Sequence, residues 1–165
     1  MSEIRITPQP LSRDAFAAFG DVIETSGRSY IEINQGNTKS FELPAMLDTR
    51  DQDGFPRLSI YRSQPVSMPF QVQQLERHPL GSQAFMPLSG MPFLVVVAPP
   101  GDELLTESVQ AFITDGQQGI NYHKGVWHHY QLSLKQVCDY LVIDRGGAGD
   151  NCEERQLGKK LLIEY

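Results

Sequence analysis

The sequence predicts a mainly β protein, an antiparallel barrel or sandwich with one short helix near its N-terminus. From about residue 58 onward, short segments rich in β-branched and aromatic residues follow one another, and Pro, Gly, Asp or Asn separates most of them. Such segments, with no helices between them, are typical of antiparallel sheets rather than of βαβ units. With 165 residues, of which 40% are hydrophobic and 21% charged, we expect a single domain over residues 1–165.

The helix is expected directly after Ser12, a residue suited to the N-cap position. Phe16 and Phe19 have helical spacing, and Gly20 is suited to the left-handed conformation that ends many helices. Residues 25–56 are polar and poor in strand signals, so an arm, a lid or a partner-binding flap is expected there. The strands expected after this segment are residues 58–62, 70–76, 93–98, 109–114, 126–132, 137–144 and 160–165.

Charge and hydropathy exclude several classes of partner. The 14 Lys and Arg residues against 20 Asp and Glu residues give a net charge of −6, and basic residues do not cluster, so nucleic acid is not an expected partner. The N-terminus lacks the apolar core of a signal peptide, and the apolar run 93–98 is too short to span a bilayer. A cytoplasmic protein without a membrane partner is therefore expected, with Cys138 and Cys152 as free thiols.

All four histidines lie in two short islands, residues 76–83 and 122–129. Glu76 and His78 are two residues apart, so on a β-strand their side chains face the same side, and Gln83 is available from the following turn. A carboxylate and an imidazole suit a divalent transition metal, or they serve as an acid/base pair without one. The concentration of histidines thus points to one site.

The spacing of the islands resembles the two motifs of the cupin superfamily. The first island and its continuation read Glu-x-His-x4-Gln-x6-Gly, and the second contains His-x-Gly-x-x-His. Compared with the usual motifs, Glu76 replaces a His, Gln83 replaces a Glu, and His123 replaces a Pro. Because a neutral amide is a weaker ligand than a carboxylate, metal binding is expected to be loose. The resemblance implies a cupin-like barrel with metal ligands at Glu76, His78, Gln83 and His128.

Strand alternation adds an expectation about the second island. If His128 points inward, Val126 and Tyr130 share its face, whereas Trp127 and His129 face the other way. His129 is therefore expected to lie outside the site. A buried histidine on a barrel strand can also be a structural, hydrogen-bonded residue, and this alternative is open for each histidine.

Longer stretches of the chain resemble the ureidoglycolate lyase family. They are residues 16–24, 62–65, 76–88, 93–98, 111–129 and 143–152. The resemblance implies a homodimeric, cytoplasmic, cupin-like enzyme that eliminates urea from (S)-ureidoglycolate to give glyoxylate in allantoin and purine nitrogen catabolism. It also implies a divalent metal, with nickel among the candidates.

The chemistry of this substrate fits the residues of the islands. One carbon bears a hydroxyl, a carboxylate and the urea nitrogen, so loss of the hydroxyl proton allows a carbonyl to form as urea leaves, without a protein nucleophile. His123 and Lys124 are the candidates for the general acid, and the other catalytic candidates are His78 and His128. The candidates for binding the substrate carboxylate are Arg62, Lys124 and Arg145. For each arginine, a surface ion pair is the alternative.

Two other functions stay open. One is another metal-dependent cupin enzyme, such as an isomerase or an oxygenase, although an oxygenase would favour a histidine-rich triad over Glu76 and Gln83. The other is a non-enzymatic barrel that binds a carboxylate. Such a sensor would need a DNA-binding or signalling segment, and a single domain is expected to use the whole sequence, so this alternative ranks lowest.

Overall fold

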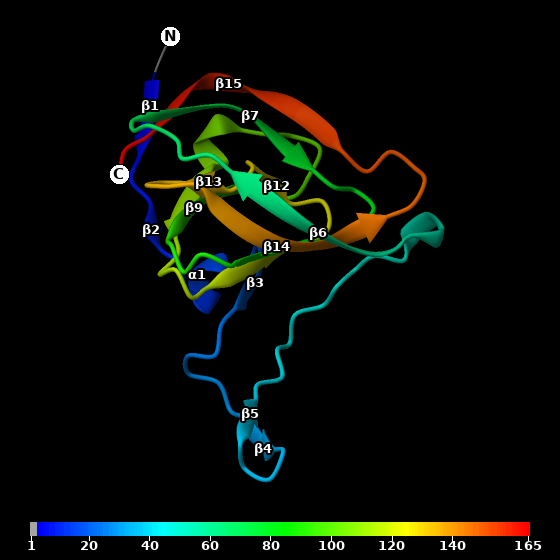
Figure 1. The fold of residues 1–165 in the computed structure, drawn as a ribbon. Coiled ribbons are helices and arrows are strands. Elements are labelled where there is room, and N and C mark those ends of the chain that lie inside the picture. The colour runs from blue at the N-terminus through cyan, green and yellow to red at the C-terminus, as the bar shows by residue number, and fades with distance from the viewer. Residues whose placement is uncertain (1–2) are drawn as a thin grey trace.

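Two large curled sheets and a small hairpin make up the computed structural model, which describes residues 3–165 (Figure 1). The eight-stranded sheet contains β1 (Glu3–Ile6), β2 (Gln9–Pro10), β7 (Phe70–Arg77), β9 (Phe93–Ala98), β10 (Gln110–Ile113), β12 (Trp127–His128), β13 (Leu132–Ser133) and β15 (Glu153–Ile163). The five-stranded sheet contains β3 (Gly20–Ile23), β6 (Phe55–Ser63), β8 (Gln83–Pro87), β11 (Gly119–Tyr122) and β14 (Cys138–Gly146). The hairpin pairs β4 (Ile31–Ile33) with β5 (Thr38–Ser40).

The predicted mainly β fold with a short N-terminal helix is confirmed. In the larger sheet the strand order is β1-β15-β7-β12-β9-β10-β2, and β13 also pairs with β9. In the smaller sheet the order is β3-β11-β8-β14-β6. Most neighbouring strands are antiparallel, but β1 runs parallel to β15 and β2 parallel to β10. The remaining helical elements are α1 (Arg13–Phe16) and two single 3₁₀ turns, η1 (Asp51–Asp53) and η2 (Thr106–Ser108).

The helix begins where the sequence predicts, but it ends differently. Ser12 is the N-cap, and its hydroxyl accepts a hydrogen bond from the Ala15 N–H at 3.2 Å. Gly20 does not end the helix, because the chain leaves the helix at Ala17 in a right-handed conformation and Gly20 already belongs to β3. Glycine is required there for another reason, since a Cβ on Gly20 would lie 2.0 Å from the carbonyl oxygen of Asn121 on β11.

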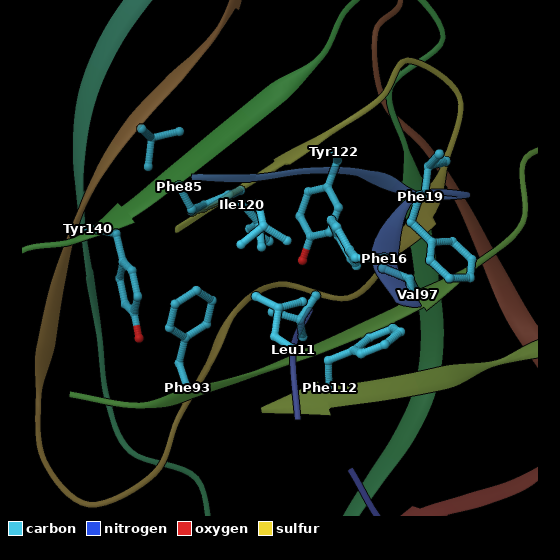
Figure 2. Packing of buried hydrophobic residues seen from close by; sticks show 14 of the residues in the cluster. Leu11, Phe16, Phe19, Phe85, Phe93, Val97, Phe112, Ile120, Tyr122 and Tyr140 are labelled. Carbon is cyan, nitrogen blue, oxygen red and sulfur yellow. The ribbon is translucent and has the colours of Figure 1, made fainter. Parts of the chain in front are cut away.

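Strand β9 separates the two hydrophobic clusters of the barrel. All six of its residues are buried, which explains its continuous apolar sequence. Phe93, Val95 and Val97 face the cluster that includes Phe16, Phe85, Tyr122 and Tyr140 (Figure 2). Leu94, Val96 and Ala98 face the other cluster, which includes Leu75, Trp127 and Leu161. The two faces of β9 therefore pack against different parts of the core.

Strand bounds differ from the predicted ones in the second half of the chain. The strand predicted at residues 126–132 is interrupted, because it forms β12 and β13 with an irregular stretch between them. Strand β15 begins at residue 153 rather than 160, and its pairing with β7 shifts register between Gln156 and Leu161. Strands β8 and β11, which are short, were not predicted. Both lie next to the functional site described below.

The first part of the segment 25–56 extends away from the barrel as an arm that carries the β4–β5 hairpin, and its end returns to the barrel at η1 and the start of β6 (Figure 1). Tyr30 packs against Phe41 with ring centroids 5.4 Å apart, and Lys39 Nζ lies 4.4 Å from the Tyr30 ring centroid. Ile31 and Ile33 are exposed on the hairpin. Both cysteines are free, as expected. Between residues 3 and 165, every helix is too short or too polar to cross a lipid bilayer.

Candidate functional site

The two histidine islands meet where β7 and β12 lie side by side. Glu76 on β7 and His128 on β12 are direct neighbours in the strand register, and His78 follows β7. Glu76 Oε1 lies 3.5 Å from His128 Nε2 and 3.8 Å from His78 Nε2. One ligand atom from each of these three side chains lies within 4.8 Å of the other two. The structure therefore gathers three of the predicted metal ligands at one point.

The ring of His128 is fixed on one face and at one nitrogen. It stacks on Tyr122 with ring centroids 4.1 Å apart and an interplanar angle of 13°. Its Nδ1–H donates to the carbonyl of Val126 at 3.0 Å, which leaves the Nε2 lone pair directed toward Glu76. Nε2 is buried and has no hydrogen-bond partner among residues 3–165. Burial lowers the pKa of His128, so the ring is neutral at neutral pH.

Gln83, the fourth predicted ligand, joins the cluster through His78. His78 Nδ1 donates to the carbonyl of Asn151 at 2.6 Å, and its Nε2 lies 3.1 Å from Gln83 Oε1. On its other side, Gln83 Nε2 donates to Asp144 Oδ2 at 3.4 Å. Arg57 Nε and Nη2 donate to the two oxygens of Asp144 at 3.0 and 2.9 Å. A chain of contacts thus runs from Arg57 to the histidines.

The charges at the cluster suit a bound cation. The pKa of the Glu76 carboxyl group lies below its ordinary value, because His128 and, to a smaller extent, His78 stabilise the carboxylate when their rings carry a proton in acidic solution; burial acts in the opposite direction. Glu76 is therefore ionised at neutral pH. Its Oε2 accepts a hydrogen bond from Cys152 Sγ at 3.7 Å. Burial and the charge of Glu76 raise the pKa of Cys152 to about 11, which keeps it as a thiol.

These side chains fit a divalent transition metal. Two imidazole nitrogens, one carboxylate and one amide oxygen converge, and the borderline character of imidazole suits such ions. The buried Nε2 of His128 lacks a hydrogen-bond partner among the described side chains, and a metal ion would supply one. Backbone carbonyls hold the second ring nitrogen of both histidines, as is usual for metal-binding histidines.

A cavity of about 780 Å³ opens beside the cluster. Its volume accommodates a small molecule, and most of its wall is polar or charged. The lining residues include Arg57, Tyr61, Arg62, Ser63, Glu76, His78, Ser82, Gln83, Tyr130, Gln131, Asp144, Arg145, Asn151 and Cys152. His128 lies behind this wall, because its ring is 1% exposed.

The two predicted arginines differ in their surroundings. Arg62 lines the cavity, is largely exposed, and forms a bidentate ion pair with Asp139 at 2.8 and 2.9 Å. Arg145 is buried, and its guanidinium donates to the backbone carbonyls of residues 51, 52 and 148. Those contacts fasten η1 to the turn after β14. Because Nε and Nη2 are occupied by backbone carbonyls, these contacts support a structural role for Arg145, while its predicted binding of a carboxylate stays a prediction.

The predicted general acids do not reach the cavity wall. His123 Nε2 lies 3.1 Å from Asp21 Oδ2, and Lys124 Nζ lies 2.7 Å from Asp51 and 3.1 Å from Asp48. His123 therefore contacts β3, and Lys124 contacts the end of the segment 25–56. Gly125, with φ of +81°, turns the chain directly after them, so they do not follow the strand that carries His128.

His129 lies on the opposite side of the chain from His128. Its ring packs edge-on against Phe70 with centroids 5.4 Å apart, and its Nδ1 donates to the carbonyl of Tyr130 at 3.1 Å. Trp127 likewise packs in the second hydrophobic cluster, whereas Tyr130 lines the cavity. These positions agree with the strand alternation expected from the sequence.

Sequence reasoning missed Arg57, Asp144 and Asn151. Asp144 had a usable signal, because an acidic residue at an inward position of the apolar strand β14 requires a partner. Asn151 had none, since its backbone carbonyl, rather than its side chain, holds His78.

We expect the free energy of unfolding to fall when the pH is lowered from about 7.5 to about 5.5. Burial lowers the pKa of His128 and His129 below 6.5 in the folded protein, so the unfolded chain binds more protons in this range. Urea unfolding at several pH values measures the effect. A His129→Phe variant keeps an aromatic ring against Phe70 and is expected to show a shallower dependence; an unchanged slope would contradict the assignment.

The family model and the similar curated proteins give the same family over most of the chain. A family model described as ureidoglycolate lyase matches residues 3–164. A ureidoglycolate lyase of Burkholderia mallei is 52% identical over 155 residues, which are 94% of this chain and 91% of that protein. One of Pseudomonas aeruginosa is 51% identical over 146 residues, 88% of this chain and 86% of that protein. Among solved structures, the sugar 3,4-ketoisomerase QdtA from Thermoanaerobacterium thermosaccharolyticum aligns with a TM-score of 0.44 and 12% identity, covering 80% of this chain and 85% of that one.

Proposed function

Because this chain belongs to the ureidoglycolate lyase family, we propose that its cavity binds (S)-ureidoglycolate and that the Glu76–His78–His128 cluster is the catalytic centre. The protein is an enzyme, a lyase that releases urea from ureidoglycolate and leaves glyoxylate. The observation that carries the assignment of the site is the convergence of these three side chains beside a polar cavity. The activity is tested by measuring the urea and the glyoxylate released per substrate consumed, with a correction for spontaneous decay of the substrate. Equal amounts of both products support the proposal, and ammonia in place of urea would contradict it.

Glu76, His78, Gln83 and His128 would hold the metal, for which nickel is the first candidate. When bound, a divalent metal would lower the pKa of the substrate hydroxyl and favour the alkoxide. Glu76 contributes negative charge because its lowered pKa keeps it ionised, and His128 contributes a neutral nitrogen lone pair. The carbonyls of Val126 and Asn151 keep both rings in position, so little reorganisation is needed when substrate enters.

Arg62 is proposed as the partner of the substrate carboxylate. Its guanidinium is 71% exposed, and its present partner Asp139 lies in a solvent-accessible pair of small energetic value. Exchanging that pair for a bidentate contact with a substrate carboxylate therefore costs little. Arg57, which also lines the cavity, is engaged with the buried Asp144 and is less free to turn.

An Arg62→Met variant is expected to raise KM about 10-fold and to leave kcat within about two-fold, because the contact is made equally in the ground and transition states. Steady-state kinetics measure both constants. Arg13→Met serves as the control, since Arg13 pairs with Glu24 away from this cavity. A loss confined to kcat would contradict the proposed role.

The variants His123→Gln and Lys124→Met test the predicted general acids. We expect each to keep kcat within about three-fold of the wild type, because neither side chain lines the cavity; His123 pairs with Asp21 and Lys124 pairs with Asp51. A general acid typically contributes about 100- to 10,000-fold, so a kcat loss of that size would restore the predicted role.

We further propose a homodimer that acts in the cytoplasm within allantoin and purine nitrogen catabolism, as the family resemblance implies. Exposed apolar side chains on the arm and on the edge strand β6 support a second copy as the partner; they include Ile31, Met46, Leu58 and Ile60. The particle mass in solution, measured by light scattering, tests the dimer, and a monomer at micromolar concentration would contradict it.

A further inference from the structure

We infer that Asp144 is a positioning residue: held by Arg57, it sets the orientation of the Gln83 amide toward the Glu76–His78–His128 cluster. The catalytic consequence of this inference rests on the proposed function, whereas the orientation itself does not. Arg57, Asp144 and Gln83 occupy matching positions on three neighbouring strands. Asp144 on β14 is in register with Arg57 on β6 and with Gln83 on β8.

The contact with Asp144 favours one orientation of the Gln83 amide. A carboxylate only accepts hydrogen bonds, whereas an amide donates at one end and accepts at the other. Because Asp144 lies 3.4 Å from one end of the Gln83 amide, that end is the NH₂ group. The carbonyl oxygen then points the other way, toward His78 Nε2 at 3.1 Å. In the tautomer whose Nδ1–H donates to Asn151, both of these atoms present lone pairs, and two such atoms side by side suit a bound cation. Asp144 therefore decides that an oxygen, rather than an NH₂ group, faces the cluster.

Arg57 keeps Asp144 in place. It donates to both carboxylate oxygens, so the carboxylate cannot rotate without losing a hydrogen bond. Asp144 is 93% buried, and the guanidinium compensates its charge there. Arg57 thus acts on Gln83 indirectly, by holding the Asp144 carboxylate that contacts the Gln83 amide.

The same contact explains why residue 83 is an amide. Gln83 Nε2 lies 3.4 Å from Asp144 Oδ2. A carboxylate at residue 83 would place a second negative charge at about this distance from Asp144. Like charges at that distance disfavour each other strongly in a buried site. Gln83 supplies an oxygen to the cluster and a donor to Asp144, and Glu cannot supply both.

The test compares Asp144→Ala in the wild-type and Gln83→Ala backgrounds, using the full-length protein. One readout is the ring signal of His78 in a long-range ¹H–¹⁵N spectrum of the metal-free protein. The other is the Kd for nickel(II), measured by calorimetry after the protein has been stripped with a chelator. We expect Asp144→Ala to shift the His78 ring signal and to weaken nickel binding by about 10- to 100-fold. Both effects should be absent when Gln83 is already Ala.

Asp139→Ala is the matched control. Asp139 forms the same kind of bidentate pair with Arg62, between the same two strands, but Gln83 contacts Asp144 instead. Its loss is expected to leave the His78 signal and the nickel Kd unchanged. If Asp144→Ala does not fold, Asp144→Asn keeps the volume and can present an NH₂ group to Gln83; the Gln83 amide is then expected to reverse, which shifts the same His78 signal.

Two results would overturn the inference. One is a His78 ring signal that stays in place in the Asp144 variants. The other is a loss of nickel affinity that is equally large with and without Gln83, because Asp144 would then act by another route. If the wild-type protein binds no nickel, the metal part of the proposed function fails, and the His78 spectrum still decides the orientation of Gln83.

Discussion

Replacing His128 by Ala is expected to lower the rate of urea release by about 100- to 10,000-fold, whereas replacing His129 by Ala should leave it within about three-fold. The two residues are adjacent, and their side chains face opposite sides. His128 directs its buried Nε2 toward Glu76 at 3.5 Å, and the ring of His129 packs against Phe70. Removing His128 therefore takes a nitrogen from the catalytic centre, while removing His129 changes packing.

The comparison needs a check on folding, because both variants remove a buried ring. His128→Ala leaves a cavity against Tyr122, and deletions of this kind cost about 2–5 kcal/mol of stability. Urea unfolding of both variants separates a loss of structure from a loss of chemistry. An equal loss of activity in two folded variants would refute the assignment of His128 by strand alternation.

The parts of the site that depend on local sequence were predictable. Residues two apart on a strand share a face, which placed Glu76 with His78 and separated His128 from His129. The same alternation accounts for β9, where neighbouring residues face different hydrophobic clusters. These are statements about one strand at a time, and the hydrophobic pattern of that strand is sufficient to make them.

The parts that depend on strand register were not predictable. Arg57, Asp144 and Gln83 are far apart in the sequence and meet only because β6, β14 and β8 are neighbours in one sheet. His123 and Lys124 show the opposite case, since they are close to His128 in sequence. Residue 125 turns the chain after them, and their side chains contact Asp21 and Asp51 instead of the cavity wall.

Removing the metal proposed at the Glu76–His78–His128 cluster is expected to lower kcat by more than about 100-fold, because stabilising the alkoxide by several kcal/mol corresponds to a factor of that size. The protein is treated with a chelator, its metal content is checked by elemental analysis, and nickel(II) is then added back. We expect activity to return in proportion to bound nickel. His128→Ala, treated in the same way, should bind less nickel and recover little activity.

Full activity in protein shown to be free of metal would contradict this prediction. Glu76, His78 and His128 would then act as acid/base groups instead of metal ligands. Glu76 is ionised and lies beside two imidazoles, so it would then have to accept the hydroxyl proton itself. The pH dependence separates the two cases. A carboxylate base with a lowered pKa stays active into acidic solution, whereas nickel is lost as protons compete for the imidazole nitrogens. Activity in the presence and absence of nickel at about pH 5 therefore distinguishes a metal-binding role of Glu76 from that of a general base.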